Sequence, residues 1–68
     1  MARYSKFKTV IDGDEQTYRS ENATYTALCD WAAQQEDGAV ADVFVQEGGD
    51  PWYPFAYHVV RGGFLDER

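Results

Sequence analysis

Residues 20–35, SENATYTALCDWAAQQ, decide the fold class of this chain. Ser20 and Asn22 both offer side-chain oxygens that can cap a helix, and the acidic Glu21 suits the positive end of the helix dipole. The stretch therefore predicts one amphipathic helix that ends near Gln35, with Gly38 as its stop. The apolar side chains that repeat at i, i+3, i+4 and i+7, and should form its buried stripe, are Tyr25, Leu28, Cys29 and Ala32.

The segment before this helix has the pattern of a β-hairpin. Residues 4–11 mix apolar side chains with two lysines, as a strand with one solvated face does. Asp12 and Gly13 follow, and a glycine supplies the positive φ that a tight hairpin turn requires. Residues 15–19 are then the returning strand, short and polar on one side.

After the helix, the alternation of a strand returns twice. Residues 39–46 and 52–61 both alternate, and a turn rich in glycine separates them. Pro54 cannot donate a ladder hydrogen bond, so the second strand begins at an edge, begins after Pro54 or contains a bulge. Gly62 and Gly63 end this strand, and a charged tail follows. The side chains expected on one face of the second strand are Tyr53, Phe55, Tyr57 and Val59.

The order of these elements is β-β-α-β-β. A chain of 68 residues has room for one domain, which we expect to span residues 1–68. The predicted fold class is α+β, with a mainly antiparallel four-stranded sheet and one helix packed on one face. Because the helix covers only one face, aromatic side chains of the last two strands should remain on the open face.

The charge of the chain limits the partners it can have. Twelve acidic residues against six basic ones leave a net charge of −6, which disfavours duplex DNA and anionic membranes and suits a basic partner. The single cysteine cannot form an internal disulfide, and no apolar run has the length of a signal peptide or a membrane span. We therefore expect a cytoplasmic protein that does not bind membranes.

The sequence contains no pattern that predicts catalysis, a metal site or a cofactor. His58 is the only histidine, and Cys29 is expected in the core as an inert filler. Asp12, Asp14 and Glu15 form the densest acidic cluster, but they lack the spacing of a calcium-binding loop. No motif is specific enough to identify a family. The expectation is a non-enzymatic protein without catalytic residues, metal or cofactor.

The aromatic stretch at residues 52–57 is the least ordinary part of the chain. Such rings either fill the core of so small a domain or form a contact face, since tryptophan and tyrosine are enriched at binding hot spots. We expect an interaction module that occupies a basic surface of a larger protein, with an inhibitor that mimics DNA as one form. The residues expected to bind this partner are Trp52, Tyr53, Phe55, Tyr57, Phe44, Asp42, Glu47 and Asp50.

Two alternatives remain open from the sequence. One is a small module that binds single-stranded nucleic acid by stacking bases on the aromatic rings of the sheet. Its phosphate contacts would come from the basic residues Arg3, Lys6, Lys8 and Arg19. The other is a homodimer, formed through the open face or through the edge of the last strand.

Overall fold

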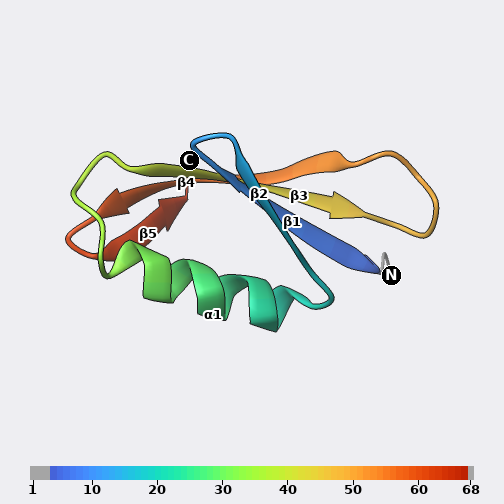
Figure 1. Ribbon diagram of the computed structural model, residues 1–68, viewed down its shortest axis with the longest axis horizontal. Coiled ribbons are helices and arrows are strands. Elements are labelled where there is room, and N and C mark those ends of the chain that lie inside the picture. The colour runs from blue at the N-terminus through green and yellow to red at the C-terminus, as the bar shows by residue number, and fades with distance from the viewer. Residues whose placement is uncertain (1–3, 68) are drawn as a thin grey trace.

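The computed structural model describes residues 4–67 and has an α+β fold with one helix and a five-stranded antiparallel sheet (Figure 1). Along the chain the elements are β1 (Lys6–Ile11), β2 (Asp14–Tyr18), α1 (Glu21–Ala32), β3 (Val40–Gln46), β4 (Tyr53–Arg61) and β5 (Phe64–Glu67). The strands lie side by side in the order β2-β1-β3-β4-β5. The α+β class is confirmed, whereas the predicted count of four strands is wrong.

The β1–β2 hairpin forms where the sequence predicts it. Asp12 and Gly13 connect the two strands with φ angles of 53° and 79°. Two consecutive positive φ angles define the type I′ turn, whose twist matches that of the flanking strands. Asp12 tolerates this conformation because a short polar side chain is one of the few that adopts it readily.

The helix begins after Ser20, one of the two predicted caps, and ends earlier than predicted. The Ser20 hydroxyl accepts a hydrogen bond from the backbone N–H of Ala23 at 3.1 Å, which caps the first turn. The helix ends at Ala32 rather than near Gln35. Gly38, with φ 96°, lies in the following loop, where its N–H donates to the carbonyl of Val60.

The buried stripe of α1 consists of Thr24, Leu28 and Ala32, while Cys29 is exposed. The expectation of a buried Cys29 is therefore wrong. Thr24 can occupy the stripe because its hydroxyl donates to the carbonyl of Ser20 at 2.8 Å, so no polar group is left unsatisfied. Trp31 lies beside the stripe and packs against the core.

The fifth strand occupies the segment that the sequence analysis treats as a charged tail. Gly62 and Gly63 have φ angles of 59° and 80°, which is again the pattern of a two-residue type I′ hairpin turn. Beyond this turn, β5 pairs with β4, with Leu65 opposite Val60. The carboxylate of Asp37 accepts the N–H of Gly62 at 2.8 Å and ties the turn to the loop after α1.

A β-bulge divides β4 into two parts. Ala56 pairs with Val43 and Pro54 pairs with Phe44, so Phe55 has no partner in β3. This irregularity follows from Pro54, which has no N–H to donate to the ladder. A bulge is one of the three outcomes that the sequence leaves open for this strand.

The sheet and the helix form two layers with the core between them. Leu28 of α1 packs against Ala41 and Val43 of β3 at the centre of this core. Figure 1 shows that α1 (green) covers only one end of the sheet, and that the β3–β4 hairpin (yellow to orange) extends past the helix. The helix-bearing face of the sheet is therefore uncovered at the end of this hairpin.

Candidate partner-binding pocket

The uncovered end of the β3–β4 hairpin contains a pocket of about 520 Å³. The residues that line it are Tyr4, Val45, Glu47, Asp50, Tyr53, Pro54 and Phe55. Polar and apolar surface both contribute to its lining, which includes three aromatic residues and two acidic ones. We call this the aromatic pocket.

The β-sheet register positions the side chains of the aromatic pocket. Tyr53 is the Cα partner of Val45, and directly opposed residues of an antiparallel pair point to the same face. Val45 is buried on the helix-bearing face, so Tyr53 projects there too. The bulge adds Phe55 to the same face, as its ring contact with the buried Phe7 shows.

The rings of Tyr4, Phe7 and Phe55 contact one another along one side of the pocket. The ring of Tyr4 lies 6.1 Å from that of Phe7 and 5.8 Å from that of Phe55, and the rings of Phe7 and Phe55 are 6.1 Å apart. The three interplanar angles are 80°, 74° and 90°, which is the edge-to-face geometry that aromatic quadrupoles favour. Phe7 is buried, whereas Tyr4 and Phe55 keep exposed surface.

The acidic residues of the pocket lie in a loop that hydrogen bonds hold in place. The side-chain amide of Gln46 donates to the carbonyl of Asp50 at 2.9 Å, and the N–H of Asp50 donates to the carbonyl of Glu47 at 3.1 Å. Ser5 ties this loop to the start of β1, because its hydroxyl accepts the N–H of Gly48 at 3.2 Å. Glu47 and Asp50 form no ion pair within residues 4–67.

The structure divides the predicted partner-binding residues between two faces. For Tyr57 the bulge is the reason, because it interrupts the alternation that the sequence predicts for β4. Tyr57 is the Cα partner of Asp42 on the open face, so it does not share a face with Phe55. The predicted residues that line the aromatic pocket are Glu47, Asp50, Tyr53 and Phe55. Those on the opposite, open face are Asp42, Phe44, Trp52 and Tyr57.

On the open face, Lys8 lies between two aromatic rings. Its Nζ is 4.8 Å from the ring centroid of Trp52 and 5.4 Å from that of Phe44. A carboxylate oxygen of Glu15 lies 3.6 Å from the same Nζ, and the Lys8 side chain is only 17% exposed. We call these four residues the Lys8 cluster. Trp52 therefore lies on the open face of the sheet, where its ring contacts the ammonium group of Lys8.

The structure does not gather the basic residues of the nucleic-acid alternative. Arg3 lies outside the described residues. Lys6 is exposed on β1, Lys8 belongs to the Lys8 cluster, and the exposed Arg19 follows β2.

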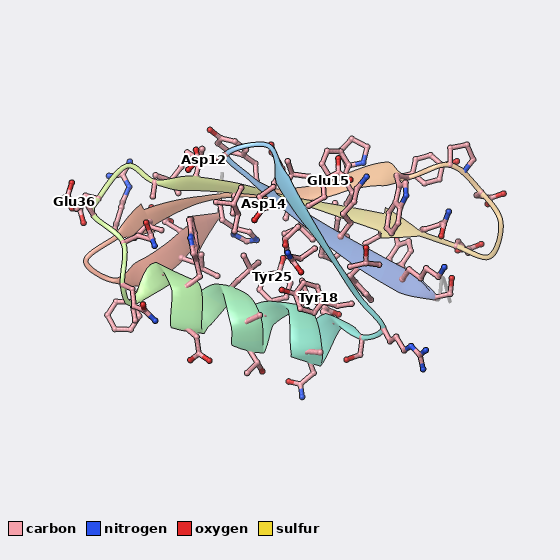
Figure 2. All side chains as sticks on the ribbon, viewed as in Figure 1. Asp12, Asp14, Glu15, Tyr18, Tyr25 and Glu36 are labelled. Carbon is pink, nitrogen blue, oxygen red and sulfur yellow. The ribbon has the colours of Figure 1, made fainter. Side chains whose placement is uncertain are left out.

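A second pocket, of about 390 Å³, lies between the β1–β2 hairpin and α1. Figure 2 shows Asp12 and Asp14 at the tip of this hairpin and Tyr18 at the other end of β2, near α1. Trp31 of the helix contributes to the lining of this pocket. Within the described part of the chain, no group of three or more histidine, cysteine or acidic side chains could hold a metal ion.

The only histidine and the only cysteine of the described residues have different surroundings. His58 is buried, and its Nε2 lies 2.8 Å from the hydroxyl of Tyr25. Cys29 lies on the exposed side of α1. His58 and Tyr25 also stack edge to face, with ring centroids 5.3 Å apart, which is the environment of a packed core histidine.

Three residues of the aromatic pocket are missing from the predicted set: Tyr4, Val45 and Pro54. Pro54 within a strand signals a bulge that turns Phe55 toward β1, whereas Tyr4 is brought to the pocket by the strand order, which local sequence does not reveal. No helix in the described residues is long and apolar enough to cross a membrane. Comparisons of this chain with protein-family profiles, curated proteins and solved structures find no match.

Proposed function

We propose that this protein is a non-enzymatic interaction module that binds a basic surface of a larger protein through the aromatic pocket. The observation that carries the proposal is the pocket itself, in which exposed rings and two carboxylates meet beyond the end of the helix. Tyr53 is 54% exposed although it is large and partly apolar. Burying such a ring in an interface contributes about 2 kcal/mol or more where it becomes a hot spot.

The charge of the molecule has a separate role in this proposal. A net charge of −6 attracts a basic surface over about one Debye length, roughly 8 Å at physiological salt. Attraction of this kind raises the association rate, whereas desolvated rings lower the dissociation rate. An inhibitor that occupies a nucleic-acid-binding surface is one form of this function, because its carboxylates would stand where phosphates bind.

Binding of single-stranded nucleic acid is the second candidate, and it has less support. The open face does carry aromatic rings near lysines, as base stacking would need. However, the ammonium group of Lys8 is already held by Trp52, Phe44 and Glu15. A phosphate approaching it would have to compete with a carboxylate in an acidic molecule.

The proposal is tested by capture with matched tyrosine variants. Tagged wild-type protein, Tyr53→Ala and Tyr57→Ala are incubated with a nuclease-treated lysate of the source. Tyr57 is the control, because it is 40% exposed and lies on the open face. We expect a stoichiometric protein partner that wild type and Tyr57→Ala retain and Tyr53→Ala loses.

Three other results would count against the proposal. Equal capture by all variants would exclude the aromatic pocket as the binding surface. Nucleic acid that stays bound to the tagged protein after the lysate proteins are stripped off would favour the second candidate. Sedimentation of the purified protein as a dimer that Tyr53→Ala converts to a monomer would assign the pocket to self-association. A partner displaced by duplex DNA would support the inhibitor form.

A further inference from the structure

We propose that the aromatic pocket receives an arginine side chain of the partner. This inference rests on the proposed function and specifies the chemistry of its site. The pocket combines exposed aromatic rings with the carboxylates of Glu47 and Asp50, and no lysine or arginine of the described residues lines it. Aromatic faces and carboxylates both carry negative potential, so their common complement is a cation.

The same combination of groups already holds a cation elsewhere in this molecule. On the open face, the Nζ of Lys8 lies within 5.4 Å of two ring centroids and 3.6 Å from the carboxylate of Glu15. Two rings and one carboxylate thus surround the end of a lysine side chain that is only 17% exposed. The lining of the aromatic pocket contains the same kinds of acceptor groups and no lysine or arginine, which is the basis for expecting the cation from a partner.

The rigidity of the pocket favours a ligand that needs a fixed geometry. Tyr4 and Phe55 are held by their edge-to-face contacts with the buried Phe7. The loop that carries Glu47 and Asp50 is tied internally by Gln46 and to β1 by Ser5. Side chains ordered before binding lose little conformational entropy when the ligand arrives.

Arginine fits these groups better than lysine does. A guanidinium is planar, so it can stack on one ring while its N–H groups reach a carboxylate. It is also more weakly hydrated than an ammonium, which lowers the cost of its removal from water. A phosphate-bearing ligand is disfavoured, since the only charged groups of this lining are Glu47 and Asp50.

The test uses the whole protein and short capped peptides that contain one arginine between glycines. Two-dimensional NMR spectra are recorded during titration with this peptide and with matched peptides containing citrulline or lysine. Citrulline keeps the shape of arginine and removes its charge. We expect the arginine peptide to shift the resonances of Tyr4, Tyr53 and Phe55 saturably in the millimolar range, and the citrulline peptide to leave them unchanged.

Two variants identify the groups that hold the arginine. The double variant Glu47→Gln, Asp50→Asn keeps the shape of the lining and should weaken the arginine peptide about tenfold. Tyr53→Leu should weaken it by a similar factor, about tenfold, through loss of the ring. Tyr57→Leu, on the open face, should leave the affinity unchanged. The spectrum of each variant without peptide shows whether its fold is preserved.

Several results would overturn this inference. One is binding of the citrulline or the lysine peptide as tightly as the arginine peptide. Another is unchanged affinity of the Glu47→Gln, Asp50→Asn variant for the arginine peptide. A third is a set of resonance shifts confined to the pocket near Asp12 and Asp14. Partner capture that depends on Tyr53, combined with no binding of the arginine peptide, would overturn the inference alone. Partner capture that does not depend on Tyr53 would overturn the proposed function.

Discussion

The Ser20 side chain stabilises the fold through one hydrogen bond at the start of α1. In Ser20→Ala, the N–H of Ala23 loses its acceptor, so we expect the free energy of unfolding to fall by about 1 kcal/mol. Urea denaturation followed by circular dichroism measures this change. Thr26→Ala, at an exposed position in the middle of α1, is the control and should not be destabilising. Equal stability of Ser20→Ala and wild type would show that the cap contributes nothing.

Lys8 contributes to stability through its contacts with Trp52 and Glu15. We expect a coupling energy of about 0.5–2 kcal/mol between Lys8 and Trp52, because the Lys8 side chain is largely buried and its Nζ lies near the ring. A double-mutant cycle of Lys8→Met and Trp52→Leu, read from urea denaturation, measures it. Lys6→Met is the matched control, since Lys6 is exposed on the same strand. Strictly additive effects at positions 8 and 52 would contradict the cation–π contact.

Cys29 and Thr24 show where prediction at the level of single residues failed. A hydropathy pattern counts cysteine as apolar and threonine as polar, so it placed the buried stripe over Cys29. In the structure, Thr24 lies in the stripe because its hydroxyl bonds to the carbonyl of Ser20. The hydrogen bond removes the cost of burying the hydroxyl, and no hydropathy scale contains that term. The cap was predictable to within two residues, Ser20 or Asn22, because it depends only on neighbours in sequence.

At the scale of elements, the turn at Gly62 and Gly63 forms the last hairpin. A β-branched residue at Gly62 would have to adopt φ 59°, so we expect Gly62→Val to be destabilised by about 1–2 kcal/mol. Gly62→Asn should be close to wild type, because asparagine is favoured at this position of a type I′ turn. Thermal denaturation of the two variants provides the comparison. Equal melting temperatures would exclude a strained left-handed conformation at Gly62.

The rule that glycine favours a tight hairpin turn predicted the β1–β2 hairpin but did not lead to the β4–β5 hairpin. Asp12 and Gly13 stand between two recognisable strands, so the first turn was identified. After Gly62 and Gly63, four strand residues remain, two of them acidic, and so short a segment shows no clear period. Strand β5 forms because pairing with β4 places Leu65 opposite Val60 at the edge of the core. This stabilisation comes from tertiary contacts, which local sequence does not reveal.

The bulge explains why the aromatic residues predicted to bind a partner from β4 were wrongly grouped by face. The aromatic composition of residues 52–57 indicated a contact surface, and four of the eight predicted residues line the aromatic pocket. A strict period of two then placed Tyr53, Phe55 and Tyr57 on one face. One unpaired residue, Phe55, shifts the alternation of everything on its far side. Tyr4, which precedes β1, joins the site from a segment distant in sequence, and predicting this requires the strand order to be known.

At the scale of the whole molecule, the core lies under α1 and the aromatic pocket lies beyond it, so stability and binding should be separable (Figure 1). A domain of 68 residues has a free energy of unfolding of roughly 3–10 kcal/mol. Truncating a buried aromatic ring costs about 3–5 kcal/mol, so Phe7→Ala should be largely or wholly unfolded at elevated temperature. Tyr53→Ala removes an exposed ring and should change stability by no more than about 0.5 kcal/mol.

Thermal and urea denaturation of Phe7→Ala and Tyr53→Ala decide whether this separation holds. Phe7 lies beneath Tyr4 and Phe55, so its loss should abolish both the fold and the pocket. A strongly destabilised Tyr53→Ala would mean that the ring supports the β3–β4 hairpin, and loss of partner capture in that variant would then carry no information about recognition. If Tyr53→Ala is stable but no longer binds the partner, the Tyr53 side chain contributes to partner binding and not to the stability of the fold.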